Sequence, residues 1–598
     1  MRIFARSCVA LLALGAAMPA RAAVEAPTAT QALGTATSAA ALHTSTRATV
    51  PAQLDAVQRN NYRAAFAAIR AGDWSSAAAR LDAMPDGLLT PIARAELYIA
   101  KGSPKVETAQ LVALLASGPE LPEADQIARI ARSRGVVDLP ALPIENGLTR
   151  MPGAPRRQSA RSLRSDAAAA ALGAKITPLI KADSPSAAEA LLNDAESQLS
   201  PEALTEWQQR VAWSYFLTGD DGAARRLAVR ARTGPGEWAV QADWVAGLAA
   251  WRQRDCAAAA QAFSTVAARA ADPEMTAAGL FWTARADTAC GHPERVEARL
   301  RSASRLGETF YGLLASAALG VAPPSHEALP GLTTADWDKL SRRPNIRVAA
   351  ALAEIGENGL ADTVLRHQAS IGDARDHEAL LHLASRLGLP SAQIWLAQHG
   401  PAGTRLSAST RYPAPAWTPQ GGWRVDKSLV FAHALQESQF KTDVVSPAGA
   451  RGLMQILPST AQLIARRNGI PLGSLDDPAT NIAYGQLYLE QLRDADGTGG
   501  LLPKVIAAYN AGPGAVQKWN DRQRDRGDPL LFIESIPYWE TRGYVAIVLR
   551  NYWMYQRDAG VKSDSLRAMA QGMWPRFPGL PGRTAVRLDG VGGMQSAY

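Results

Sequence analysis

A glutamate at the end of an apolar helical segment is the first residue in this sequence that could do acid–base chemistry. Leucine, valine and alanine side chains form an apolar stripe over 429–434, and the segment 436–440 (QESQF) follows it. A carboxyl group at the end of such a helix is partly removed from water, which raises its pKa. Glu437 is therefore a candidate general acid, whereas an isolated Glu-Ser pair would ordinarily be an exposed helix end.

Three further blocks follow Glu437 in the chain. The loop 446–455 (SPAGARGLMQ) contains glycines that allow the backbone to approach a ligand closely, and Pro458 then opens a helix. The segment 477–485 (DPATNIAYG) leads to 508–514 (AYNAGPG), and 534–545 (ESIPYWETRGYV) comes last. Four such blocks in this order favour one shared site.

The order of these blocks resembles that of the soluble lytic transglycosylases of bacterial cell-wall turnover, whose catalytic domain is similar to goose-type lysozyme. The resemblance extends over about 412–555, roughly a quarter of the chain. Upstream, the segment 308–315 (ETFYGLLA) looks like the family's turn near the end of its helical superhelix. Leu435 departs from the family, where many relatives carry Arg, and this changes the charge of the groove but not the acid.

The resemblance implies a mechanism with a single carboxyl group. Glu437 donates a proton to the oxygen that leaves when the bond between N-acetylmuramic acid and N-acetylglucosamine breaks. It then takes a proton from the C6 hydroxyl of the muramyl residue, which attacks its own anomeric carbon and gives a 1,6-anhydro end. The substrate's acetamido group stabilises the cationic centre, whereas ordinary glycosidases use a second carboxylate.

The resemblance also assigns roles to other residues. It implies contacts with sugar and acetamido groups from Ser446, Met454 and Gln455, positioning of the carboxyl and substrate by Tyr509 and Asn510, and a groove-lining role for Glu534. Without the resemblance, Met454 and Tyr509 would be expected in the core. The tyrosines at helical spacing after the last block are also expected in the core, and Tyr544 is the exception that we include as a substrate contact.

The sequence predicts neither a metal nor a cofactor. His433 precedes Glu437 by four residues, so both lie on one helical face, but no third ligand has suitable spacing. The sequence also lacks a phosphate-binding glycine loop, a Ser-His-Asp signature and a zinc pattern.

The elements that must position these residues are helices. Alanine-rich segments dominate, and aromatic residues make up only 6% of the 598 residues. Breaks occur at 72–73, 219–220, 254–255 and 291–292, and the last three are spaced by 35 and 37 residues, near the period of tetratricopeptide-like hairpins. We expect a mostly α protein with an N-terminal α-superhelix of helical hairpins, either a true repeat array or irregular, and a C-terminal goose-lysozyme-like α domain.

Composition shifts predict the domain boundaries. They give a signal peptide (1–22), a flexible leader (23–50), helical hairpins (51–136), an exposed Pro- and Arg-rich linker (137–166), a superhelical domain with linker helices (167–400), a Pro/Gly-rich connection (401–424), a further domain (425–575), which the resemblance makes the lysozyme-like catalytic domain, and a flexible tail (576–598). Cys256 and Cys290 remain after processing, either as one disulfide or as two buried thiols.

The N-terminus reads as an export signal. Arg2 and Arg6 precede an apolar run at 9–17, and small residues allow cleavage near Ala22, which predicts a periplasmic protein. No other apolar stretch approaches the ~20 residues of a membrane span, so no stable transmembrane anchor is expected. Cys8 lacks the sequence context for lipid attachment.

Charge and resemblance together define the expected partners. The chain has 63 basic and 55 acidic residues, and its excess of basic residues suits an anionic polymer. The resemblance selects peptidoglycan glycan strands rather than nucleic acid, with cell-wall synthesis proteins as further candidates and a monomeric state. Two rival functions stay open: a muramidase that hydrolyses the same bond with water, and a non-catalytic scaffold that binds peptidoglycan.

Overall fold

The computed structural model describes residues 49–163, 166–321, 331–522 and 524–588, and these contain 27 α-helices and four two-residue strands. The mostly α prediction is confirmed. The predicted signal peptide and all but the last two residues of the predicted leader lie outside the described residues. Within the described ranges, no helix combines the length and the apolar character that a membrane span requires.

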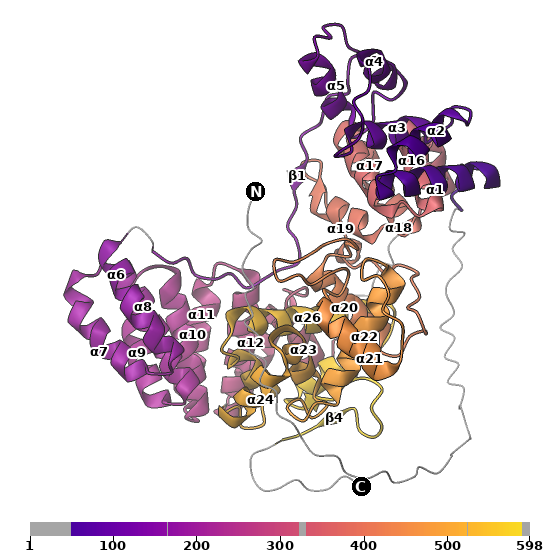
Figure 1. The fold of residues 1–598 in the computed structure, drawn as a ribbon. Helices are drawn as coiled ribbons and strands as arrows, with labels where there is room; N and C mark the ends of the chain where they lie inside the picture. The colour runs from indigo at the N-terminus through magenta and orange to yellow at the C-terminus, as the bar shows by residue number, and fades with distance from the viewer. Residues whose placement is uncertain (1–48, 164–165, 322–330, 523, 589–598) are drawn as a thin grey trace.

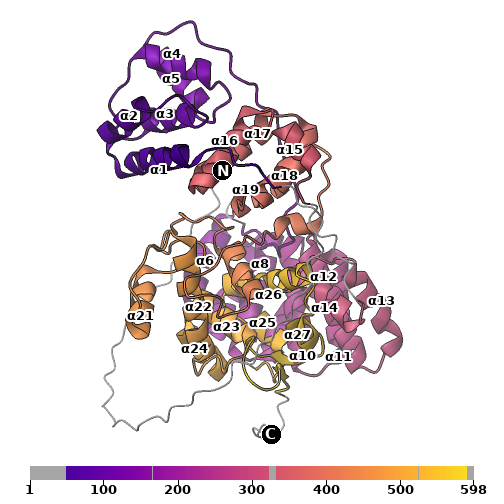
Figure 2. The ribbon, with the colours of Figure 1, turned by 90° about the vertical axis from the view of Figure 1, so that its right-hand side faces the viewer.

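The N-terminal helices share a core with helices that come about 300 residues later (Figures 1 and 2). The range 167–400, for which the sequence predicts a superhelical domain and linker helices, therefore divides in the structure: the apolar faces of 331–397 are buried against the N-terminal hairpins. The elements of this unit are α1 (Ala56–Ala71), α2 (Trp74–Asp82), α3 (Thr90–Ile99), α4 (Thr108–Ser117), α5 (Ala124–Ser133), α15 (Thr334–Leu340), α16 (Pro344–Ile355), α17 (Asn358–Ile371), α18 (His377–Arg386) and α19 (Pro390–Gln398).

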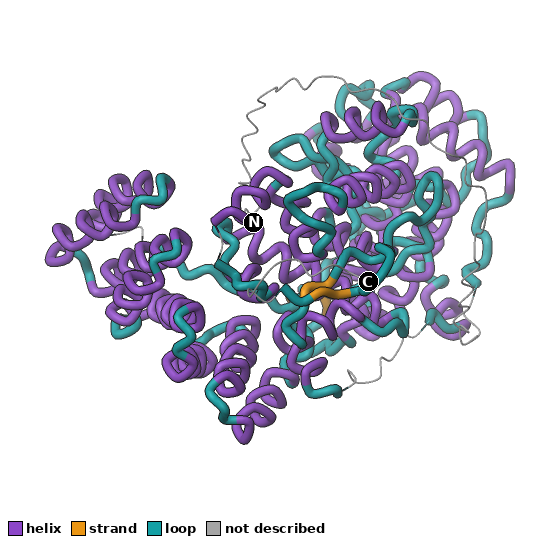
Figure 3. Tube along the Cα trace, turned by 90° about the horizontal axis from the view of Figure 1, so that it is seen from below, coloured by secondary structure: helices purple, strands orange, loops and turns teal. Residues whose placement is uncertain are grey.

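The superhelix is an arc of hairpins that extends away from the rest of the molecule (Figures 1 and 3). Its breaks fall where the sequence predicts them, and Asp220 and Asp255 cap the helices that follow two of them. The helices are α6 (Ala167–Lys181), α7 (Pro185–Ala195), α8 (Pro201–Thr218), α9 (Asp221–Ala231), α10 (Gly236–Arg252), α11 (Cys256–Arg269), α12 (Pro273–Ala289), α13 (Pro293–Ser304) and α14 (Phe310–Ala318).

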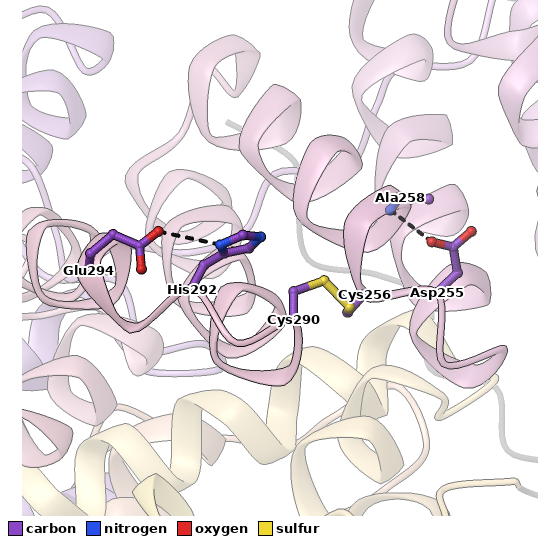
Figure 4. Close-up of a disulfide and its surroundings, with 6 residues drawn as sticks. All are labelled: Asp255, Cys256, Ala258, Cys290, His292 and Glu294. Atoms are coloured by element: carbon purple, nitrogen blue, oxygen red, sulfur yellow. Dashed lines mark hydrogen bonds and ion pairs between the residues drawn. A yellow bond between two sulfur atoms is a disulfide. The ribbon is translucent and has the colours of Figure 1, made fainter.

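A disulfide links two neighbouring hairpins of this arc. Cys256 at the start of α11 and Cys290 just after α12 are joined, with their Cα atoms 5.5 Å apart (Figure 4). Of the two alternatives that the sequence leaves open, the structure has the bridge.

The C-terminal domain packs against α14 and shares a continuous core with the superhelix. Its elements are α20 (Lys427–Glu437), α21 (Pro458–Asn468), α22 (Pro478–Arg493), α23 (Leu502–Ala511), α24 (Pro513–Arg522), α25 (Pro529–Glu534), α26 (Trp539–Asp558), α27 (Asp564–Ala570), β3 (Trp574–Pro575) and β4 (Ala585–Val586). The antiparallel pairing of β3 with β4 contradicts the flexible-tail prediction for residues up to 586.

The linker between the N-terminal hairpins and the superhelix is an extended segment, residues 144–163, which we call the strap. Its strand β1 (Thr149–Arg150) pairs antiparallel with β2 (His399–Gly400). Further on, Arg157 lies between Glu534 at the end of α25 and the ring of Trp244 on α10, and Ser162 donates to Glu206 on α8. The prediction of an exposed linker is confirmed in that no residue of the strap is buried, and the structure adds contacts through which the strap joins three parts of the fold.

Candidate active site

Glu437 is the last residue of α20, and the ends of α20 and α26 are fastened to each other. Asp426 caps the start of α20 by accepting from the backbone N–H of Ser428. The same carboxylate accepts from the hydroxyl of Tyr552 at 2.7 Å and from Gln556, both on α26. This arrangement fixes the packing of α26 against the helix that presents Glu437.

Glu437 has the protonation behaviour of a general acid. Its side chain is half-buried, and Tyr544 on α26 donates a hydrogen bond to Oε1 at 2.6 Å. Burial raises the pKa of Glu437 to about 7, although the hydrogen bond from Tyr544 lowers it and the charge of Glu540 raises it. The carboxyl group is therefore divided between its protonated and ionised forms near neutral pH.

Glu540 is a residue that the sequence reasoning missed. It is exposed, lies one turn before Tyr544 on α26 and acts on Glu437 through its charge. The spacing of four residues between Glu540 and Tyr544 was the signal that could have identified it, because such a pair shares one face of a helix.

Tyr509 is hydrogen-bonded to the glycine-containing loop 446–455 rather than to the carboxyl group of Glu437. Its hydroxyl donates to the backbone oxygen of Met454 at 2.7 Å, and its ring lies 4.7 Å from the imidazole of His433. Its neighbour Asn510 accepts a hydrogen bond from Thr541 on α26 at 2.6 Å. The direct hydrogen bond to Glu437 comes from Tyr544 instead.

The loop 444–456 has a fixed backbone. Gln455 has a left-handed φ of 49°. Its side-chain amide nitrogen, Nε2, donates to the backbone oxygens of Val444 and Gly452. Asn481 on α22 accepts from the N–H of Met454 and donates to the backbone oxygen of Leu475. Asn481 is buried and was given no role from the sequence, but it fixes the loop that carries Gln455.

Gly452 and Ser446 shape the same loop. A Cβ atom at Gly452 would lie 2.2 Å from the backbone oxygen of Leu475, and the φ of Gly452 is +72°, so glycine is required there. Ser446 is half-buried, and its hydroxyl oxygen accepts from the N–H of Ala450. Ser446 and Gln455 therefore keep partial solvent access, as a contact with substrate would need.

Three predicted site residues are buried, namely Met454, Glu534 and Tyr544, and the 4% exposure of Tyr544 leaves its hydrogen bond to Glu437 in place of the predicted sugar contact. Met454 is fully buried and packs so tightly against Gly485 that a Cβ there would lie 2.1 Å from its sulfur. Glu534 is 2% exposed; it pairs with Arg157 of the strap at 2.8 Å and accepts from the hydroxyl of Tyr311 on α14. Glu534 therefore does not line the groove, and its carboxylate joins the strap to the C-terminal domain.

His433 is fully buried on α20. Its Nδ1 is hydrogen-bonded to the backbone oxygen of Leu429, and burial lowers its pKa to about 4, so its ring is neutral at neutral pH. The described residues contain no group of three or more metal-ligating side chains around it or elsewhere.

Comparisons with known proteins agree on the C-terminal domain. Residues 418–532 match the model of the transglycosylase SLT domain. The soluble lytic murein transglycosylase of Escherichia coli is 41% identical over 155 residues, 25% of this chain and 24% of the relative. A membrane-bound lytic murein transglycosylase C of Haemophilus ducreyi is 41% identical over 110 residues, 17% of this chain and 30% of the relative. The matches thus span about a quarter of the length of the first of these relatives.

Two solved structures share the fold over most of the chain. The 70 kDa soluble lytic transglycosylase of Escherichia coli has a TM-score of 0.52 at 17% identity, covering 87% of this chain and 99% of that one. An inactive mutant of lytic transglycosylase Slt from Pseudomonas aeruginosa, in which one glutamate is replaced by glutamine, has a TM-score of 0.52 at 19% identity, covering 86% and 88%. This chain therefore carries a transglycosylase SLT domain, of the kind found in soluble lytic murein transglycosylases, within the fold of those proteins.

Proposed function

We propose that the protein is a lytic transglycosylase that cleaves the β-1,4 bond between N-acetylmuramic acid and N-acetylglucosamine in peptidoglycan. The observation that carries this proposal is the half-buried carboxyl group of Glu437, whose pKa is raised to about 7 and which accepts a hydrogen bond from Tyr544. A group with this pKa can donate a proton and later accept one at the same pH. The SLT domain and the relatives support the choice of bond.

The proposed reaction uses Glu437 twice. The protonated carboxyl donates its proton to the glycosidic oxygen as the bond to the anomeric carbon breaks, and the substrate's acetamido group stabilises the positive charge. The carboxylate then removes the proton from the C6 hydroxyl, whose oxygen bonds to the anomeric carbon and forms the 1,6-anhydro ring. Ser446, Gln455 and Asn510 are proposed to hold the sugars, and Tyr544 to fix the carboxyl group.

Hydrolysis is the second candidate function, and Glu540 is the observation that favours it. A muramidase would need a base to activate water, and Glu540 is an exposed carboxylate close enough for its charge to act on Glu437. Mass spectrometry of products from purified sacculi separates the two: anhydro-muropeptides one water lighter than the hydrolysis products support the transglycosylase, and reducing ends overturn it.

The variant Glu437→Gln tests the assignment of the acid. It retains the shape of the side chain, and its cleavage rate should fall by about 10²–10⁴-fold, the contribution typical of general acid–base catalysis. Binding to sacculi should persist. Normal cleavage by this variant would mean that another residue is the general acid. A wild-type protein that binds sacculi but does not cleave them would favour the non-catalytic scaffold.

We also propose that the protein works in the periplasm as a monomer, after removal of residues 1–22. The export pattern at the N-terminus and the relatives named for murein support this location. Cell fractionation with N-terminal sequencing of the mature protein tests it, and a mature N-terminus near residue 23 is the expected result.

A further inference from the structure

Two neighbouring aromatic side chains are unusually exposed. Among the aromatic side chains in the described residues, only Tyr538 (54%) and Trp539 (40%) are more than about a third exposed. They are adjacent in sequence at the start of α26. Exposed amphipathic rings are enriched at binding surfaces, because their apolar faces gain from being covered.

Both rings are held in place from behind. The buried Trp519 of α24 meets the ring of Tyr538 edge to face, with centroids 5.4 Å apart. The buried guanidinium of Arg542 lies 5.5 Å from the ring of Trp539 and 4.2 Å from that of Trp213 on α8. A ligand therefore meets rings that are already ordered, so binding costs little side-chain entropy.

The aromatic pair, Tyr538 and Trp539, adjoins the candidate active site. Glu540, whose charge acts on Glu437, is the next residue after Trp539. The following residue, Thr541, donates to Asn510 at 2.6 Å. The pair is thus continuous with the site on one side, and Arg542 connects it to Trp213 of the superhelix on the other.

We infer that the aromatic pair is a sugar-binding subsite, whose occupant is a pyranose ring of the glycan strand beyond the sugars at the cleaved bond. This inference rests on the proposed function. The axial C–H bonds of a β-linked hexosamine form an apolar face that matches the face of an indole or phenol ring. The subsite guides a strand from the catalytic groove towards α8, so it contributes affinity only to substrates long enough to reach it.

The test measures binding of glycans in the Glu437→Gln background, where no cleavage occurs. The probes are chitohexaose and purified, uncrosslinked peptidoglycan strands, measured by isothermal titration calorimetry. Adding Trp539→Ala should weaken binding of the long strands about tenfold, the size of one lost aromatic contact. Trp539→Phe should restore part of the affinity. Val561→Ala, which trims a side chain that is 54% exposed beyond the far end of α26, is the matched control and should have no effect.

Three results would overturn the inference. Equal affinity of the Trp539→Ala and parent proteins for long strands overturns the inference, even when the wild type cleaves sacculi. Loss of self-association, measured by ultracentrifugation, with no loss of glycan affinity also overturns it and assigns the surface to a second copy of the chain. Absence of cleavage by the wild type overturns the proposed function, and the inference fails with it.

Discussion

Tyr544 donates its hydroxyl hydrogen to Oε1 of Glu437 at 2.6 Å, from a helix that begins 102 residues after α20 ends. The hydrogen bond stabilises the ionised carboxyl, whereas burial and the charge of Glu540 favour the protonated form. The pKa of about 7 is the balance of these effects. Since α26 supplies both Tyr544 and Glu540, this one helix provides the two opposing effects that act on a pKa raised chiefly by burial.

The two α26 residues should shift the pH profile in opposite directions. The acid must be protonated to act, so cleavage should decline as pH rises through about 7. Tyr544→Phe removes the hydrogen bond to the carboxylate, which raises the pKa and moves this decline to higher pH. Glu540→Gln removes a negative charge, which lowers the pKa and moves the decline to lower pH. Profiles of kcat/KM for both variants check this, and shifts in the same direction would contradict it.

Glu437→Gln should stabilise the fold at neutral and alkaline pH. The pKa of Glu437 rises from an ordinary value of 4.5 to about 7 on folding, so the folded state binds the proton more tightly. The free energy of unfolding therefore falls as pH rises from about 4.5 to 7, by roughly 1.4 kcal/mol for each pH unit between these two values. The variant lacks this loss, so its Tm should exceed that of the wild type above pH 7 and approach it near pH 4.5. A Tm difference between variant and wild type that does not depend on pH would contradict the raised pKa of Glu437 in the folded protein.

Arg157→Met should destabilise the junction between strap and C-terminal domain by about 3–5 kcal/mol, because it leaves the buried carboxylate of Glu534 without its ion pair. Burial raises the pKa of Glu534, but Arg157 outweighs burial and holds it below its usual value. The double variant with Glu534→Met should recover most of the loss.

Urea unfolding of both variants measures this coupling. Arg301→Met serves as control, because its ion pair with Glu297 is exposed and should be worth less than about 1 kcal/mol. Equal losses in the Arg157 and Arg301 variants would show that the buried pair does not hold the junction.

Met454→Ala should lower the free energy of unfolding by about 2–5 kcal/mol, because the side chain is buried against Gly485. Met454→Leu conserves the volume and should cost less than about 1.5 kcal/mol. Calorimetry measures both. An unchanged Tm together with a raised KM would instead show that Met454 contacts the sugar, as the resemblance implies.

Reduction of the disulfide should destabilise the superhelix by about 3–4 kcal/mol, since the bridge closes a loop of 34 residues. Cys256→Ser combined with Cys290→Ser should have the same effect as a reducing agent. Cleavage of sacculi at room temperature should continue, because the bridge lies in α11 and α12. A Tm that reduction leaves unchanged would contradict the expected constraint.

Features fixed by neighbouring residues could be predicted from the sequence. The breaks at 219–220 and 254–255 depend on side chains and backbone groups a few residues apart, so local patterns reveal them. The position of Glu437 at the end of an apolar helix is local in the same sense. Its pKa could be predicted in direction, because the cause is burial.

Features that depend on distant partners could not be predicted. Glu534 carries the same side chain whether it lines a groove or pairs with an arginine, and its partner Arg157 lies 377 residues away. The union of the first five helices with 331–397 is equally non-local. Nothing in the Pro- and Arg-rich composition of the strap distinguishes a solvated linker from a segment held between helices.

The strap also dictates an order of events as the chain is made. A nascent chain emerges from its N-terminus, and Arg157 leaves the ribosome long before Glu534 exists to neutralise it. The contact between the strap and the C-terminal domain therefore cannot form until nearly the whole polypeptide is available, whereas the partners of the strap at Glu206 and in β2 precede Glu534 in the chain. A chain truncated before α25 lacks Glu534, so it leaves the guanidinium of Arg157 without the carboxylate that pairs with it in the complete fold.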